Sequence, residues 1–178
     1  MLLFRWTPEG LLCSGGPKSF AVFPPGAVQC DLSFFSVPEE ECKEQQISWP
    51  GEYDIAGMAI RGIGQNEGKQ VSYVVSVQGT RCAFLSSPLG EWSDADIAQL
   101  GTVDLLVLPG EHAKAVQKLL DAVDPRLLFL LPSKNGIDRE VLKVCGAEGK
   151  EHVTEYKLKG ALPAEGREVV VFGGPDRN

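Results

Sequence analysis

The sequence has no apolar run long enough to cross a membrane. Its longest apolar stretches, such as 127–131, fall far short of the ~20 residues that a membrane-spanning helix needs. The opening segment 1–6 already contains Arg5, and Pro8 follows, so it lacks the apolar centre of a secretory signal peptide. These absences predict a cytoplasmic protein that has no membrane partner.

Positive charge is also scarce. The chain has 17 Lys and Arg against 24 Asp and Glu, which gives a net charge of −7. A surface that binds nucleic acid or anionic lipid through charge alone needs clustered Lys and Arg. The candidates, 156–159 and Arg177, are thin. We therefore expect no nucleic-acid partner.

Cysteine and histidine do not form a recognisable pattern. The five cysteines are odd in number and widely separated, and no two form C-x-x-C, which argues against a disulfide framework and a zinc knuckle. The glycines at 15–16 suggest a phosphate loop, but Pro17 removes one of the backbone N–H groups on which such a loop depends. No G-x-S-x-G segment is present, so a nucleophile elbow is not indicated.

The composition of the chain is typical of a globular protein, and its two halves show different secondary-structure patterns. A length of 178 residues predicts one domain, 1–178. Short apolar segments separated by Gly and Pro predict strands at 2–6, 11–13, 20–23, 31–35, 54–63 with a turn at Gly57, 71–77 and 80–85. The second half predicts helices from Ser93 to Gly101, at 113–123 and at 138–145, alternating with strands at 103–108, 126–131, 152–158 and 168–172. This order predicts an α/β sandwich.

The central stretch 31–55 is the most informative part of the chain. The apolar strand 31–35 breaks at Ser36-Val37-Pro38 and is followed by the acidic run 39–44, which we expect to be helical. Trp49-Pro50-Gly51 then predicts a tight turn into a further strand. A strand that ends in a short loop is a common place for functional residues.

The order of these segments resembles the metallo-β-lactamase superfamily, and within it the short lactonase-like hydrolases. The resemblance covers residues 1–134 and depends on the segments 50–55, 80–90, 92–101 and 103–109. It implies an αββα sandwich, here small or truncated.

In that family the strand corresponding to 31–35 runs into S-H-x-H-x-D-H, whose side chains hold two metal ions. The corresponding residues here are Ser36, Val37, Glu39, Glu41 and Cys42. The family's H-L-G-D corresponds to 84–87, which is Phe-Leu-Ser-Ser, and its last histidine corresponds to Pro132. The two histidines, His112 and His152, match none of these positions.

Because valine, phenylalanine and proline cannot bind a cation, we expect no metal cofactor and no zinc site. The resemblance then implies a non-catalytic pseudo-enzyme that acts as a binding or scaffolding module. The short chain further predicts a homodimer.

Two alternatives remain open. One is a metal-dependent hydrolase of the ester, lactone or phosphodiester class, with a rearranged site that uses Glu39, Glu41, Cys42 or His112. These residues can also be explained without a catalytic role. The acidic run would then be the solvent-exposed start of a helix, and His112 would be a surface residue in the first turn of another helix. The other is a binder of an unknown small molecule around Ser86, Ser87 and Ser133. The candidate cleft residues are Ser36, Glu39, Glu41, Cys42, Ser86, Ser87, His112 and Ser133.

Overall fold

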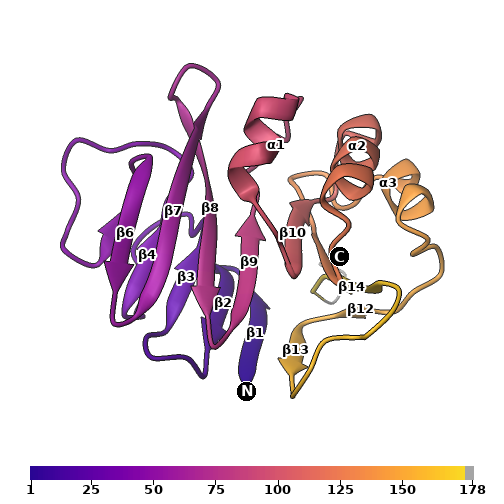
Figure 1. The fold of residues 1–178 in the computed structure, drawn as a ribbon, viewed down its shortest axis with the longest axis horizontal. Helices are drawn as coiled ribbons and strands as arrows, with labels where there is room; N and C mark the ends of the chain where they lie inside the picture. The colour runs from indigo at the N-terminus through magenta and orange to yellow at the C-terminus, as the bar shows by residue number, and fades with distance from the viewer. Residues whose placement is uncertain (175–178) are drawn as a thin grey trace.

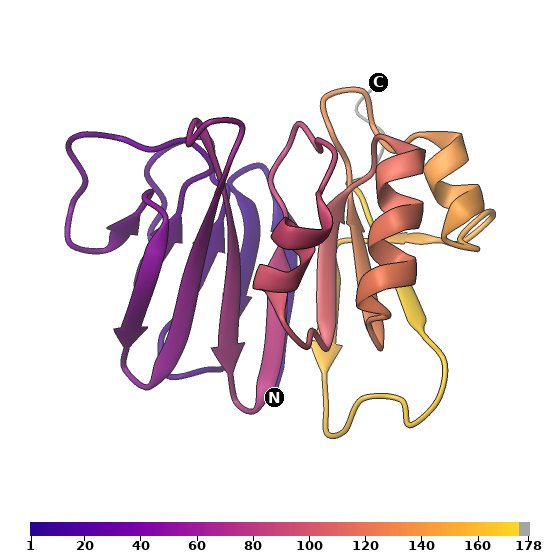
Figure 2. The same cartoon turned by 45° about the horizontal axis from the view of Figure 1, so that its top comes forward.

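The computed structural model describes residues 1–174, so Arg177 lies outside the described residues. Two β-sheets face each other, and three helices lie along one of them (Figures 1 and 2). The six-stranded sheet has the order β13-β1-β2-β3-β4-β5 and the eight-stranded sheet the order β12-β14-β11-β10-β9-β8-β7-β6. The predicted two-sheet α/β sandwich is confirmed.

The strands of the six-stranded sheet are β1 (Leu2–Thr7), β2 (Gly10–Ser14), β3 (Phe20–Val22), β4 (Leu32–Phe34), β5 (Gln46–Ile47) and β13 (Glu155–Leu158). Those of the eight-stranded sheet are β6 (Gly51–Ile55), β7 (Met58–Gln65), β8 (Gln70–Val77), β9 (Thr80–Phe84), β10 (Leu105–Pro109), β11 (Leu127–Leu131), β12 (His152–Val153) and β14 (Glu168–Phe172). The helices are α1 (Asp94–Leu100), α2 (Ala113–Val123) and α3 (Arg139–Val144).

The core between the sheets is rich in aromatic rings. Phe4 of β1 meets Phe129 of β11 with ring centroids 5.0 Å apart, and Phe34 of β4 meets Tyr73 of β8 at the same separation. The Phe4–Phe129 pair is edge-on and the Phe34–Tyr73 pair is tilted, and aromatic pairs of this kind add stabilisation beyond the buried area. Alternate residues of β8 supply this core, because successive side chains of a strand point to opposite faces.

A second core lies between the eight-stranded sheet and the helices. Val74 of β8 belongs to it, as do the buried side chains of all three helices. None of the buried helical residues in the described range packs into the core between the sheets. The helices therefore form a single layer, on the outer side of the eight-stranded sheet. The expected αββα sandwich is small in this sense, because the described residues place helices on one side only.

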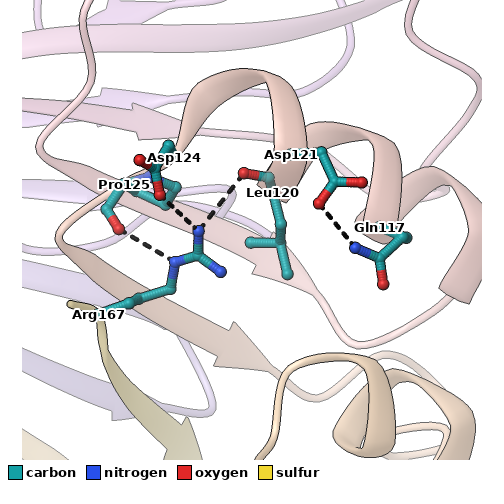
Figure 3. A network of polar contacts seen from close by, with 6 residues as sticks. All are labelled: Gln117, Leu120, Asp121, Asp124, Pro125 and Arg167. Carbon is teal, nitrogen blue, oxygen red and sulfur yellow. Dashed lines mark hydrogen bonds and ion pairs between the residues drawn. The ribbon is translucent and has the colours of Figure 1, made fainter.

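Helix α2 is fixed at both ends. His112 caps its start, and Asp124 closes its end with a left-handed backbone, φ 47°. The guanidinium of Arg167 donates to the carbonyl oxygens of Leu120 and Pro125 and pairs with the Asp124 carboxylate at 3.0 Å (Figure 3). A cation at the negative end of a helix dipole is stabilising, and it also joins α2 to the segment that leads into β14.

Two expectations about secondary structure are wrong. The acidic run 39–44 forms a loop and not a helix, because Ser48 and Trp49, which lie outside the run, bond to the backbone of Glu39. The segment 152–158 forms two strands, of which β12 pairs with β14 in one sheet and β13 pairs with β1 in the other. Within residues 1–174, no helix is both long and apolar enough to span a membrane.

Candidate functional site

The ends of several strands converge at one edge of the sandwich. Strands β9, β10 and β11 run parallel, so the segments that follow them begin at the same edge. The described structure thereby brings Ser86 and Ser87 to the edge where His112 and Ser133 also lie. Ser36 reaches this region from the other sheet, and its carbonyl oxygen accepts from the Val71 N–H at 2.8 Å.

Gln70 joins these strand ends. Its Nε2 lies 2.8 Å from the Oγ of Ser86, 3.1 Å from the carbonyl oxygen of Ser86 and 2.9 Å from that of Pro88. The amide carries two hydrogens, so three acceptors share them. Ser86 is 2% exposed, and its N–H donates to the Oγ of fully buried Ser72 at 3.0 Å. Ser86 is therefore part of a buried structural network and not a free nucleophile.

Ser87 and Glu111 form a second link across the edge. The Ser87 hydroxyl donates to Oε1 of Glu111, and the Leu89 N–H donates to the same oxygen at 3.3 Å. Glu111 follows β10 directly, so this contact ties the segment after β9 to the segment after β10. The carboxylate thus already has two protein partners.

The segment after β11 packs against Gly110. A Cβ at Gly110 would lie 2.7 Å from the side chain of Ile137, so only glycine permits this approach. The Gly110 N–H donates to Leu131, and its carbonyl oxygen accepts from Asp138. Ser133 closes its own turn, since its hydroxyl donates to Gly136 at 2.9 Å. Side chains and backbone therefore occupy this part of the edge.

His112 acts as a helix cap. It adopts a left-handed backbone, φ 59°, and its Nδ1 accepts from the Ala115 N–H at 3.2 Å. Although the residue is exposed, one ring nitrogen is engaged by the helix that it starts. The expectation of a surface histidine at the beginning of a helix agrees with this position.

The loop after β4 is held by the side chains of Ser48 and Trp49, which follow β5. Ser48 is 2% exposed; its Oγ accepts from the Glu39 N–H at 3.0 Å and lies 3.1 Å from Sγ of Cys42. The indole N–H of Trp49 donates to the Glu39 carbonyl at 2.9 Å. Glu39, Glu41 and Cys42 themselves are exposed. Cys42 is thus not at a helix N-terminus.

Tyr73 supports this loop from the core. Its hydroxyl lies 2.6 Å from the carbonyl oxygen of Phe35 and 3.0 Å from that of Ile47, where β4 and β5 end. Burial is the main cause that raises the pKa of the Tyr73 phenol far above its usual value. The phenol is therefore a neutral structural donor.

The donor groups at this edge do not fit the pair of metal ions that the sequence resemblance implies. In residues 1–174, no three His, Cys, Asp or Glu side chains come together closely enough to hold a metal ion. Glu39, Glu41 and Cys42 lie on the loop after β4, whereas Glu111 is bonded to Ser87. Imidazole and carboxylate ligands that could share one ion are not brought together.

A shallow cleft of about 290 Å³ lies beside the loop. Pro24, Phe35, Ser36, Val37 and Glu39 contribute to its walls. Of the eight expected cleft residues, only Ser36 and Glu39 line this cleft. The sequence interpretation also missed Gln70 and Glu111, although each is a polar residue next to a predicted apolar strand.

Comparison with solved structures identifies the architecture. A protein assigned as a Zn-dependent hydrolase of the metallo-β-lactamase superfamily from Thermotoga maritima superposes with a TM-score of 0.75, at 21% identity over 97% of this chain and 98% of that one. A protein assigned as a metal-dependent hydrolase from Parabacteroides distasonis gives a TM-score of 0.62, at 12% identity over 96% and 92%.

The metallo-β-lactamase fold protein YhfI from Bacillus subtilis gives a TM-score of 0.61, at 10% identity over 80% of this chain and 91% of that one. No protein-family model and no curated protein sequence matches the chain. At these identities the likeness shows the fold, and the activity must be argued from the residues.

Proposed function

We propose that this chain, which has the metallo-β-lactamase fold, is a non-catalytic member of that architecture that works as a binding or scaffolding module without a metal cofactor. The observation that carries the proposal is the direct bonding of the strand ends to one another. Gln70 bonds to Ser86, and Ser87 bonds to Glu111, at the edge where hydrolases of this fold would be expected to hold their metals.

The chemistry of the side chains supports the same conclusion. Two metal ions would need several neutral imidazoles and a carboxylate to activate a water molecule. The corresponding positions hold an exposed valine, Val37, a fully buried phenylalanine, Phe84, and Pro132. A side chain that has no donor atom cannot bind a metal ion, even if the backbone shifts.

Metal analysis and a substrate panel test the proposal together. Purified protein, with and without added zinc, manganese or iron, would be assayed for bound metal and for hydrolysis of ester, lactone and phosphodiester substrates. We expect substoichiometric metal and no hydrolysis above the uncatalysed rate. One or two tightly bound ions per chain would contradict the proposal. Metal-stimulated turnover that is lost in the double variant Glu39→Ala/Glu41→Ala would establish the rearranged hydrolase instead.

A further inference from the structure

We propose that the loop between β4 and β6 binds a positively charged protein segment that carries an apolar side chain. The contact surface, which we call the Trp49 surface, consists of Trp49, Val37 and the adjoining cleft with Pro24, Pro25 and Phe35. The inference rests on the proposed function, because it names the class of partner for a binding module. The loop is the outermost one on the side of the molecule away from α2 and α3 (Figures 1 and 2).

The first reason is the exposure of large apolar side chains. Trp49 is 51% exposed and Val37 is 57% exposed; among the described residues, only Met1 is a comparably exposed large hydrophobic residue. The indole of Trp49 is bonded to the carbonyl oxygen of Glu39, and Glu39 lines the same cleft as Val37. Tryptophan is among the residues that contribute most to binding when a partner covers them.

The second reason is that Trp49 is held in place without being covered. Its indole N–H is bonded to Glu39, and its carbonyl oxygen accepts from the Tyr53 hydroxyl at 2.8 Å. Beneath it, a Cβ at Gly62 of β7 would lie 2.9 Å from the same carbonyl oxygen, so the backbone is packed closely against the sheet. An aromatic side chain that is already ordered loses little conformational entropy on binding.

The third reason is the cleft beside Val37. Pro24, Pro25, Ala27 and Phe35 supply an apolar part of its wall, and Ser36, Glu39 and Gln46 supply a polar part. The volume of about 290 Å³ suits one or two side chains rather than a large ligand. Val37 lines this cleft and is itself exposed, so the apolar surface continues from the cleft onto the loop.

The sign of the surrounding charge selects the partner. Glu39, Glu40, Glu41 and Glu44 are exposed on the loop and Lys43 is its one cation, while Glu52 and Asp54 are exposed on the neighbouring strand β6. Glu52 pairs with Arg61 at 3.9 Å, so the unbalanced negative charge belongs to the four loop acids. Four acids against one lysine beside an apolar surface repel nucleic acid and anionic lipid, and they attract a segment rich in Lys and Arg. The strand β6 also ends the eight-stranded sheet, so its outer backbone groups are free to pair with an extended segment.

A peptide-display selection tests the inference. The full chain and its Trp49→Ala variant would serve as parallel baits for a random-sequence peptide library. We expect the wild-type bait to enrich peptides that combine Lys or Arg with aromatic or aliphatic residues. Binding of the enriched peptides, measured by fluorescence anisotropy, should weaken at least about tenfold in Trp49→Ala and should fall with added salt.

Because Trp49→Ala also removes the bond to Glu39, a second variant is needed. Glu40→Lys/Glu41→Lys leaves that bond in place and should weaken the same peptides, whereas Glu148→Lys/Glu151→Lys makes the same charge change at exposed positions after α3 and should not. Equal enrichment by both baits, enrichment of acidic peptides, or no enrichment would overturn the inference. Metal-dependent hydrolysis by the same preparations would refute the proposed function instead, so the two failures are distinguishable.

Discussion

At the scale of single residues, the edge of the sandwich is organised by Gln70. Its amide reaches Ser86 and Pro88 together, and Ser86 in turn bonds to buried Ser72. Nothing in the sequence distinguishes this glutamine from other polar residues that flank a strand. Its partners lie 16 and 18 positions away, and only the pairing of β8 with β9 brings them together.

Removal of this amide should therefore destabilise the protein. Gln70→Ala leaves the buried Ser86 hydroxyl without its amide donor, and we expect the free energy of unfolding to fall by about 1–3 kcal/mol. Urea denaturation measures the change. The matched control is Gln117→Ala, since Gln117 bonds only exposed Asp121 among its described partners. An equal loss in both variants would argue against the network.

Buried thiols should make the protein sensitive to alkaline pH. Burial raises the pKa of the Cys13 thiol from 9.0 to about 12. Between these two values the unfolded chain releases the proton and the folded chain retains it, so the contribution of Cys13 to stability falls as pH rises above 9. Below pH 9 both states are protonated and no change arises from this group.

The expected slope is about 1.4 kcal/mol per pH unit for one such group. Urea denaturation at pH 8, 9, 10 and 11 should show Cys13→Ala with a smaller loss of stability above pH 9 than the wild type. Cys42→Ala, which removes an exposed thiol, is the matched control. Parallel pH profiles for the wild type and Cys13→Ala would show that Cys13 is not protected as its burial indicates.

At the scale of elements, helices were predictable where residues within or next to the helix determine its start and end. Ser93 and Asp96 form a capping box at the start of α1, and the bounds of α2 agree with the apolar spacing over 113–123. The hairpin of β8 and β9 was equally local, because Gln78-Gly79 supplies two residues with positive φ.

Elements that depend on distant contacts were not predictable. The run 39–44 has helical composition, yet Ser48 and Trp49 bond its backbone from outside the run. The division of 152–158 arises because Tyr156 and Leu158 pair with β1 at the other end of the chain, while His152 and Val153 pair with β14. Likewise, the sequence indicated the edge at which the strand ends converge, but it did not indicate the bonds of Gln70 to Ser86 and of Ser87 to Glu111.

Helix α2 provides a test at this scale. Arg167→Met keeps the aliphatic part of the side chain but removes the donors to Leu120 and Pro125, and we expect a loss of about 1–2 kcal/mol. Arg5→Met, which breaks an exposed pair with Glu155, should cost less than about 1 kcal/mol. Chemical denaturation compares them, and a larger loss for Arg5→Met would contradict this account of the helix end.

At the scale of the whole molecule, the sandwich has unlike faces. Helices cover much of the eight-stranded sheet, whereas the described residues place no helix on the outer face of the six-stranded sheet (Figure 2). Leu3 and Leu12 are half-buried on that face; Leu3 lies opposite Lys157 of β13, and Leu12 lies opposite Arg5 of β1.

We propose that two copies associate through this face, in keeping with the homodimer that the short chain predicts. Sedimentation velocity over a range of concentrations should show a dimer that Leu12→Glu dissociates. The control Ala122→Glu changes an exposed residue of α2 and should leave the dimer intact. A wild-type protein that stays monomeric at high concentration would reject the association.

The burial of Phe84 limits which residues the fold can accept at this position. Its fully buried ring stands edge-on to Phe20, with centroids 5.9 Å apart, at the position that the sequence resemblance aligns with a metal-binding histidine. Histidine at this point would carry polar nitrogens into an aromatic interior, at a cost of about 1–3 kcal/mol before any ion could offset it. A change of Phe84 to histidine alone would thus be opposed by folding itself, whatever the imidazole could offer to an ion.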